Sequence, residues 1–316
     1  MESISMFGIN QESTPTENKL PALTTMGAVR LRVKDMNAVY DFYTKGVGLY
    51  EINSSNGEVM LGLEDHDEQG NPVERVILFL EHDPELRHPS RTDAGLFHTA
   101  VLFPTKAELS KSLVSTLNKY QELYTGAGEH LVSQAFYFAD PEGNGVELYW
   151  DRPRDEWTWS NGEVRMDTLY IDPIQFIREN LTEEEIVKAA TSTDPLGLTG
   201  TIGHVHLQVG DTAVAQDFYV KALGFDRTLG MGNQALFVSA GGYHHHMAMN
   251  IWNSRGAGPR DKTLGLGIVN LQLPGQESIA QAADRLKFHG IKSEFDGNAL
   301  RVNDPWNNTL ILNPTA

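Results

Sequence analysis

The chain has 316 residues, of which 40% are hydrophobic and 21% charged, a composition typical of a globular protein with room for two domains. Its formal net charge of −17 repels phosphate backbones and anionic lipid headgroups, which argues against nucleic acids and membrane surfaces as partners. Because the sequence contains no cysteine, disulfides and thiolate metal sites are excluded, and imidazole and carboxylate are the strong metal ligands left.

Residues 1–22 are polar, contain Pro and Asn, and lack the apolar run of a signal peptide, so we interpret them as a flexible tail. No apolar stretch elsewhere approaches the roughly 20 residues of a membrane span. We therefore expect a soluble, cytoplasmic protein whose partners are neither nucleic acids nor membranes.

Four related units follow the tail, in the order A, B, A′ and B′. The segment MGAVRLRVKDMNAVYDFYTKGVGL of unit A, from Met26, recurs in unit A′ as IGHVHLQVGDTAVAQDFYVKALGF, from Ile202. Units B and B′ are linked more faintly, through GLFHTAVLFP from Gly95 and GLGIVNLQLP from Gly265, and through DPEGNGVELYW and DPWNNTLILNP. Agreement at so many positions indicates a repeated structural module.

Each unit begins with an alternating strand, which in unit A places Val29, Leu31 and Val33 on one face. An Asp that can cap a helix comes next, followed by an amphipathic helix. This helix ends at Gly48 in unit A and at Gly224 in unit A′, because glycine accepts the left-handed conformation at a helix end. In the B units the helices are TKAELSKSLVSTLNKY and ESIAQAADRLKFHG, and the closing strand follows a DP-x-x-N turn.

These elements predict an α+β protein with helices packed on strongly curved mixed sheets. We expect residues 23–150 and 200–316 to form two domains of two βαβββ modules each, joined by an acidic connector over residues 151–199. The charged stretch DRPRDEW at the start of this connector, from Asp151 to Trp157, is interpreted as structural.

The pattern FYxxxLG at a helix end and DPxGNxxE before a final strand resembles the vicinal oxygen chelate superfamily, which includes glyoxalase I, bleomycin-resistance proteins and type I extradiol dioxygenases. Within it, GEHLVSQAFYFADPEGNGVE, from Gly128 to Glu147, is similar to the extradiol signature. The whole chain is most similar to bacterial two-domain catechol 2,3-dioxygenases, and GGYHHH and DPEGNGVELYWDRPRDEW carry much of that likeness. The resemblance implies the superfamily's four-module fold.

The resemblance also implies a metal site. Family ligands stand on a unit's first strand, seven residues before its Asp, or at the Glu of the closing strand. These positions hold His98, Glu147 and His204, with His206 on the same strand face as an alternative to His204. Two histidines and one carboxylate suit iron(II), and manganese(II) accepts the same set. The remaining equivalent positions hold Ala28, Ile268 and Ile311.

Three further residues gain roles from the resemblance. The family's acid–base histidine stands just before an apolar strand, which is the position of His246, while strand alternation would turn His245 away. Tyr137 is expected to hydrogen-bond a substrate oxygen, and His130 to contact the substrate or orient a neighbour. Each of these residues could instead be structural, and His244 and His245 stay alternatives to His246.

The ligand positions predict how the units pair. Only unit B together with unit A′ brings His98, Glu147 and His204 around one cavity. We therefore predict that modules 2 and 3 pair with each other, that modules 1 and 4 pair with each other, and that the chain has a single active centre.

Three functions stay open at this point. The first is an extradiol dioxygenase that acts on a small aromatic diol, catechol or hydroquinone, with O₂. The second is a glyoxalase-like lyase or isomerase, although such sites resemble four-ligand arrangements with two carboxylates. The third is a non-catalytic binding protein like the bleomycin-resistance members, which lack the ligands. The ligand set favours the dioxygenase, and the oligomeric state, a homo-oligomer included, stays open.

Overall fold

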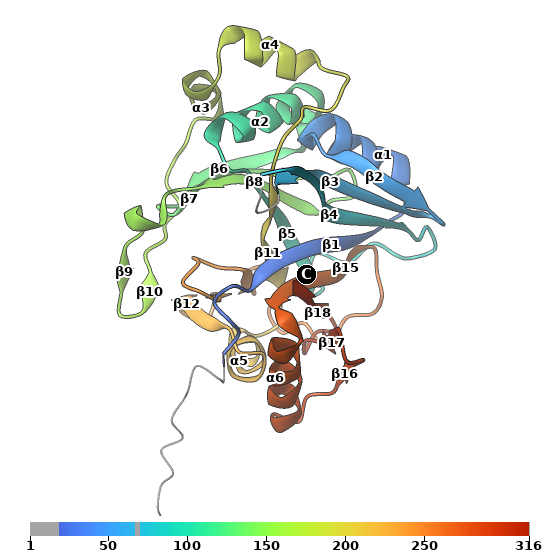
Figure 1. Cartoon of the computed structure of the whole chain (residues 1–316), viewed down its shortest axis with the longest axis vertical. Helices are drawn as coiled ribbons and strands as arrows, with labels where there is room; N and C mark the ends of the chain where they lie inside the picture. Colours follow the sequence, from blue (N-terminus) through green and yellow to red (C-terminus); the bar gives the residue numbers. More distant parts are fainter. Residues whose placement is uncertain (1–18, 67–69, 316) are drawn as a thin grey trace, which may run out of the picture.

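A computed structural model describes residues 19–66 and 70–315, and two eight-stranded mixed sheets form its centre (Figure 1). The tail predicted over residues 1–22 lies outside the described residues, except for its last four. Of these, Leu20 is buried, and its backbone N–H donates to the carbonyl oxygen of Gly224 at 2.7 Å. The packed part of the chain therefore includes residues that the sequence assigned to the tail.

Units A and B′, at the two ends of the chain, share one sheet, here named the A/B′ sheet. Strands β1 and β15 are antiparallel neighbours at its centre and join the two units. In spatial order its strands are β16 (Ser293–Phe295), β17 (Leu300–Asn303), β18 (Thr309–Thr315), β15 (Gly265–Pro274), β1 (Thr25–Val33), β4 (Pro72–His82), β3 (Glu58–His66) and β2 (Tyr50–Ser55).

Units B and A′, in the middle of the chain, share the second sheet, here named the B/A′ sheet. Strands β5 and β11 are its antiparallel central pair. In spatial order its strands are β12 (Asp226–Met231), β13 (Ala235–Ser239), β14 (Met247–Asn250), β11 (Thr201–Gln208), β5 (Gly95–Leu102), β8 (Gly145–Asp151), β7 (Ser133–Ala139) and β6 (Tyr124–Glu129). The predicted pairing of modules 2 with 3 and 1 with 4 is confirmed.

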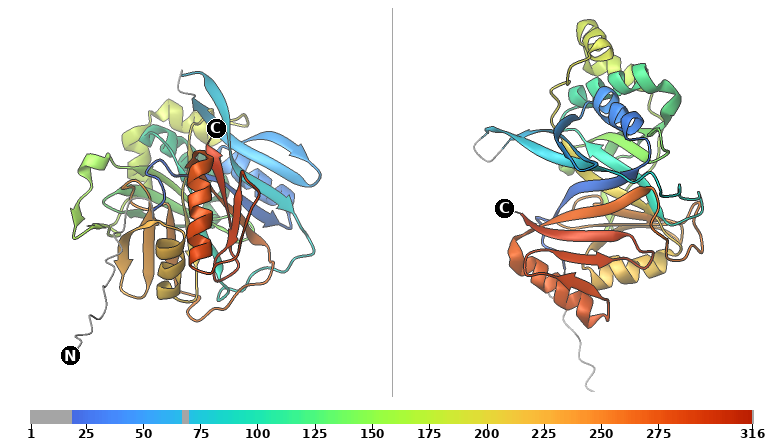
Figure 2. Two further views of the ribbon diagram at one scale, coloured as in Figure 1. Left: turned by 60° about the horizontal axis from the view of Figure 1, so that its bottom comes forward. Right: turned by 90° about the vertical axis from the view of Figure 1, so that its right-hand side faces the viewer.

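Helices lie at both ends of the molecule, with the sheets between them (Figure 2). Helices α1 and α5 each continue directly into a π-helix, which has a wider turn than an α-helix. Each π-helix buries a consecutive Phe–Tyr pair, such as Phe218 and Tyr219. The helices are α1 (Met36–Asp41) with η2 (Phe42–Val47), α2 (Lys106–Tyr120), η3 (Gln121–Leu123), η4 (Arg154–Glu156), α3 (Pro173–Asn180), α4 (Glu183–Thr191), α5 (Thr212–Gln216) with η5 (Asp217–Ala222), and α6 (Gly275–Phe288).

The capping Asp residues and the helix-ending Gly that the sequence predicts are found at the ends of these helices. The side chain of Asp35 accepts a hydrogen bond from the backbone N–H of Ala38, and Asp211 caps α5 in the same way. Gly48 follows η2 with a φ of 94°, a left-handed conformation in which a side chain would be strained. The predicted Asp caps and the helix-ending Gly48 are therefore confirmed.

Alternation along the strands of the B/A′ sheet separates two kinds of face. Val101 and Val205 are buried in the main hydrophobic core, together with residues of α2 such as Leu113. The opposite face carries small and polar residues, among them Ala100 and His204. That second face lines the candidate site.

The connector between the two halves is folded and lies against unit B. Phe176 of α3 packs on Phe136 of β7, with ring centroids 4.9 Å apart, and Asn118 of α2 donates to the carbonyl oxygen of Ala190 near the end of α4. A short hairpin of β9 (Trp159–Ser160) and β10 (Glu163–Val164) precedes these helices. The connector therefore covers part of the B/A′ sheet as well as linking the halves.

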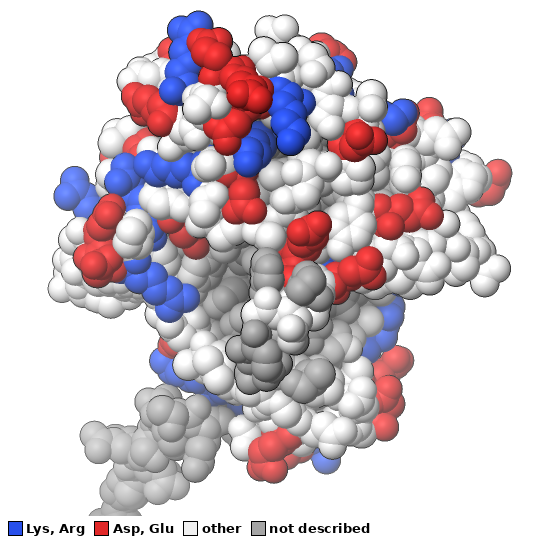
Figure 3. Space-filling view, turned by 45° about the horizontal axis from the view of Figure 1, so that its top comes forward, with Lys and Arg blue, Asp and Glu red and all other residues white. Residues whose placement is uncertain are grey.

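Charged side chains of both signs are interspersed on the face shown in Figure 3, where the described residues form no continuous basic patch. Among the described residues, no helix is both long and apolar enough to cross a membrane.

Candidate metal centre

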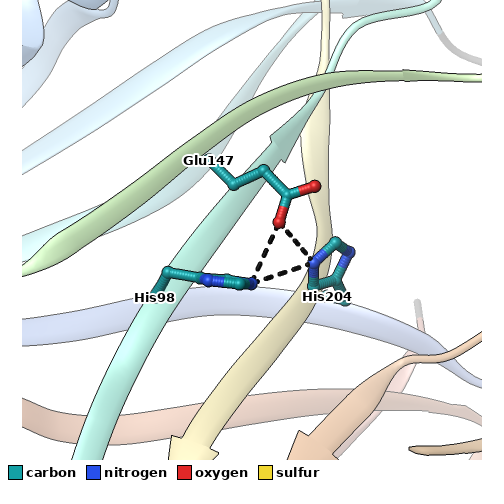
Figure 4. A group of neighbouring side chains, drawn as sticks. All are labelled: His98, Glu147 and His204. Atoms are coloured by element: carbon teal, nitrogen blue, oxygen red, sulfur yellow. Dashed lines mark hydrogen bonds and ion pairs between the residues drawn. The ribbon is translucent and has the colours of Figure 1, made fainter. Parts of the chain in front are cut away.

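Three side chains converge on one face of the B/A′ sheet, one each from β5, β8 and β11 (Figure 4). The register explains their meeting. Ala100 of β5 has one neighbour on each side. Glu147 lies next to it in the parallel β5–β8 pair, and His204 lies next to it in the antiparallel β5–β11 pair. His98 precedes Ala100 by two residues on the same strand face. Because Ala100 carries only a methyl group, the three longer side chains have room to meet.

The donor atoms of this cluster are close and buried. The Nε2 atoms of His98 and His204 each lie 3.0 Å from one carboxylate oxygen of Glu147, and 3.3 Å from each other. An ion about 2.1 Å from three donors at right angles would hold those donors about 3.0 Å apart, which the observed separations match. The three residues therefore fit a divalent cation. No other His, Cys, Asp or Glu of the described residues belongs to the cluster.

The protonation states of the cluster suit a cation. Burial alone would raise the pKa of Glu147, but the imidazoles of His204 and His98 lower that pKa well below its ordinary value. Burial also lowers the pKa of His204. At neutral pH the carboxylate is therefore charged and the His204 ring neutral, and these are the forms that bind metals.

Tyr137 and His130 form a pair beside the cluster. Tyr137 lies directly opposite Glu147 in the β7–β8 ladder, and its hydroxyl is 2.7 Å from Nε2 of His130. Nδ1 of His130 is 2.8 Å from the carbonyl oxygen of Asp167. Since a carbonyl oxygen can only accept, Nδ1 carries the proton and Nε2 accepts from the tyrosine hydroxyl. Burial and the charge of Glu147 raise the pKa of Tyr137 well above its ordinary value, so the phenol stays protonated.

The structure places His245 in the cavity, and not His246. The ring centroids of His245 and His204 are 4.2 Å apart. His246 lines a different cavity, and its Nδ1 accepts from the backbone N–H of Ala240 at 3.2 Å. The family resemblance selected His246, and strand alternation was expected to turn His245 away, but β14 begins only at Met247. Residues 240–246 form turns and bends, in which that alternation does not hold.

His206, the alternative to His204, has a different partner. Its Nε2 lies 3.0 Å from the side-chain nitrogen of Asn250, which donates to it. Its ring packs against Phe97 and Trp252, with centroid distances of 5.0 and 5.5 Å. We therefore assign His206 to the wall of the cavity.

The cavity around the cluster has a volume of about 900 Å³, which is at the upper end of the range for small-molecule sites. The connector contributes to its lining through residues 166–168. Much of the remaining wall is apolar, and it includes Leu96, Phe97, Met231, Phe237 and Trp252. The site thus combines a buried set of metal donors with a predominantly apolar chamber.

Comparison with known proteins identifies the family. The model of the Glyoxalase/Bleomycin resistance protein/Dioxygenase superfamily matches residues 25–148 and 201–310. The chain belongs to this superfamily. It is 35% identical over 286 residues to a Bacillus subtilis (strain 168) protein named catechol-2,3-dioxygenase, and the alignment covers 89% of this chain and 94% of that relative.

Solved structures show the same fold at low identity. A Bacillus subtilis protein described as a dioxygenase has a TM-score of 0.56 at 14% identity, and 94% of this chain and 86% of that one are covered. Glyoxalase I from Zea mays has a TM-score of 0.52 at 16% identity, with 92% of each chain covered. At these identities the likeness establishes the fold, while the chemistry depends on the residues of the site.

Sequence reasoning missed several residues that the fold brings to the site. Trp252 and residues 166–168 lie in loops and the connector, where strand periodicity carries no information. Asp151 is 2.8 Å from His244, although 93 positions separate them in the chain. The composition of the GGYHHH run signalled a site, but it could not show which ring faces the cavity.

Proposed function

We propose that this protein is an extradiol dioxygenase that uses iron(II) and O₂ to open the ring of a catechol. The strongest support is the buried cluster of His98, Glu147 and His204 in the wall of a cavity large enough for an aromatic diol. The 35% identity to a protein named catechol-2,3-dioxygenase adds to this support. In such a reaction the ring bond beside the diol breaks, and both oxygen atoms of O₂ enter the product.

When bound, iron(II) would supply a centre with open positions for both diol oxygens and for O₂. His98 and His204 would hold it through their Nε2 lone pairs, and Glu147 through a carboxylate oxygen. The single carboxylate makes this donor set unlike the two-carboxylate arrangement of glyoxalase sites. Manganese(II) accepts the same three donors and is the alternative ion.

His245 is our candidate for the acid–base residue, in place of His246. It is the member of the histidine run that lines the cavity, and its ring lies against that of His204. An imidazole at this position can act as a base that takes a proton from a substrate hydroxyl, and then as an acid that returns the proton to the substrate later in the reaction.

Tyr137 is our candidate for the residue that orients the substrate. Its hydroxyl proton is directed to His130, so the lone pairs of its oxygen can accept a hydrogen bond from a diol hydroxyl. His130 acts through Tyr137, because its own Nε2 is occupied by that contact. The apolar wall formed by Phe97, Phe237 and Trp252 would hold the ring and its substituents.

Metal analysis combined with an oxygen electrode tests the proposal. Protein loaded with iron(II) without air should consume O₂ on addition of catechol, 3-methylcatechol or 4-methylcatechol, with release of a yellow ring-opened product. His98→Ala, which removes one donor, should lose both the iron and the oxygen uptake. If the protein consumed O₂ with hydroquinone but with none of the catechols, the substrate class would need correction. Iron-loaded protein that consumed no O₂ with any diol would refute the dioxygenase assignment.

A further inference from the structure

A buried chain of hydrogen bonds leads away from the cavity, behind His245. Nδ1 of His245 lies 2.7 Å from Nδ1 of His244, and Nε2 of His244 lies 2.8 Å from a carboxylate oxygen of Asp151. His244 has no exposed surface and His245 only 5%. Trp157 of the connector packs on the His244 ring, with centroids 5.2 Å apart. This chain of hydrogen bonds therefore runs from the cavity to Asp151, the first residue of the DRPRDEW stretch. The sequence analysis interpreted that stretch as structural.

For a neutral His244 ring, the partners of these groups determine the direction of each hydrogen bond. A carboxylate oxygen can only accept, so Nε2 of His244 donates to Asp151. A neutral imidazole that carries its proton on Nε2 has a lone pair on Nδ1, so Nδ1 of His244 accepts from Nδ1–H of His245. The second nitrogen of His245, Nε2, then bears a lone pair. It has no hydrogen-bond partner among the described residues and belongs to the ring that lines the cavity.

Asp151 is itself held in place from a second side. The hydroxyl of Tyr243 donates to the other carboxylate oxygen at 2.8 Å, and the hydroxyl of Tyr149 lies 2.8 Å from that of Tyr243. Asp151 also shares one face of β8 with Glu147, four residues earlier. One strand therefore positions both a cluster carboxylate and the end of the histidine chain.

We propose that Asp151 and His244 are positioning residues that hold His245 in the Nδ1–H tautomer, with the Nε2 lone pair available to the substrate. A histidine that must accept a proton in the cavity needs that lone pair, and a second hydrogen bond to the ring is the means by which proteins select a tautomer. This proposal rests on the function proposed above, because it assigns a role to the way in which His245 is held.

The tautomer can be measured without activity. In full-length ¹⁵N-labelled protein loaded with zinc(II), a diamagnetic ion that takes the same donors, long-range ¹H–¹⁵N spectra distinguish the two neutral forms of each imidazole. Comparison with His245→Gln assigns the signals. We expect His245 to carry its proton on Nδ1, and an Nε2–H form in the wild-type protein would overturn the proposal.

Two substitutions then test whether this arrangement serves turnover. Asp151→Leu keeps the branched shape but removes the acceptor, and it should lower kcat about tenfold or more while KM for catechol and iron content stay within about twofold. Asp155→Leu, at an exposed position in the same segment, is the matched control and should leave kcat, KM and iron content unchanged. An unchanged kcat in Asp151→Leu, or a lowered kcat with the Nδ1–H form retained, would contradict the proposal.

The conservative replacement of His244 separates positioning from packing. The amide oxygen of His244→Asn can accept from Nδ1–H of His245, whereas His244→Leu cannot. We expect the Asn variant to keep at least about tenfold more turnover than the Leu variant, and equal losses in the two would contradict the proposal. If the wild-type protein consumes no oxygen with any diol, the proposed function fails. The zinc-loaded spectra still decide whether the histidine chain holds the tautomer.

Discussion

His245 and His246 are adjacent buried histidines in different surroundings. His245 lines the cavity beside His204, whereas His246 is held by the backbone of Ala240. We therefore expect His245→Ala to lower kcat by about 10²–10⁴ while the iron content is retained. His246→Asn should keep turnover within about threefold, because the Asn oxygen can still accept from Ala240. Steady-state oxygen uptake measures both, and a large loss in His246→Asn alone would restore His246 to the mechanism.

The environment of His246 also predicts a pH dependence of stability. Burial, with smaller effects from the nearby cationic groups, lowers its pKa to about 3 in the folded protein, whereas in the unfolded chain it is about 6.5. Because the folded-state pKa is the lower one, the contribution of the neutral ring is fully present above about pH 6.5. It is lost as the pH falls toward 3, since the unfolded chain then binds the additional proton.

We expect this loss to be absent in His246→Asn, which has no titrating ring. Between about pH 4 and 5.5, the free energy of unfolding of the wild-type protein should fall more steeply than that of the variant, by about 1.4 kcal/mol per pH unit. Urea titrations at four pH values measure the two slopes. The exposed His289 provides the control, because His289→Asn should leave the slope unchanged. Parallel slopes for wild type and His246→Asn would contradict the expectation.

At the scale of elements, strand register determines which side chains meet. Ala100 lies between Glu147 and His204 across three neighbouring strands, so a larger side chain there would occupy the space in which the donors converge. We expect Ala100→Val to weaken iron(II) binding by about tenfold or more, as measured by titration of the metal-free protein under anaerobic conditions.

A matched substitution on the same strand isolates this effect. Thr99 is also buried but faces the opposite side of β5, and its hydroxyl has no partner among the described residues. Thr99→Val should therefore leave iron affinity unchanged. Equal affinities in the Thr99 and Ala100 variants would show that the register does not control the site.

Register is also the reason that the sequence could predict the cluster. The family resemblance implied His98, Glu147 and His204 as ligands, and the register of β5, β8 and β11 brings these three side chains to one face. Alternation was no guide to His245, because the chain before β14 is a turn and the ring of His245 lines the cavity. It could not find the contact of Asp151 with His244, because that contact depends on how the connector returns across the sheet.

The two sheets of the whole molecule repeat one register. In the B/A′ sheet His206 pairs with His98, and the equivalent pair in the A/B′ sheet is Arg30 with Ile268. Likewise Ala100 and Glu147 are neighbours in one sheet, and Asn270 and Ile311 in the other. The A/B′ sheet therefore has the same architecture but no metal donors at the equivalent positions, and it is a structural counterpart of the B/A′ sheet.

This asymmetry predicts one metal ion per chain. Elemental analysis of protein reconstituted with iron(II) should give a stoichiometry near one, and His204→Ala should reduce it to near zero because the A/B′ sheet has no equivalent set of donors. A value near two, or one that survives the loss of His204, would place a metal outside the cluster. The sequence could anticipate the empty counterpart from Ala28, Ile268 and Ile311, but it could not show that the connector folds over the site.

Isotope labelling tests the dioxygenase assignment most directly. Iron(II)-loaded protein should convert catechol under ¹⁸O₂ into a ring-opened product that carries both labelled atoms, 4 mass units heavier than the product formed under ordinary O₂, provided that the product is analysed before its carbonyl oxygen exchanges with water. Mass spectrometry of rapidly quenched and reduced samples measures this shift. A product with no label, or catechol recovered unchanged from iron-loaded protein, would contradict ring cleavage by a dioxygenase.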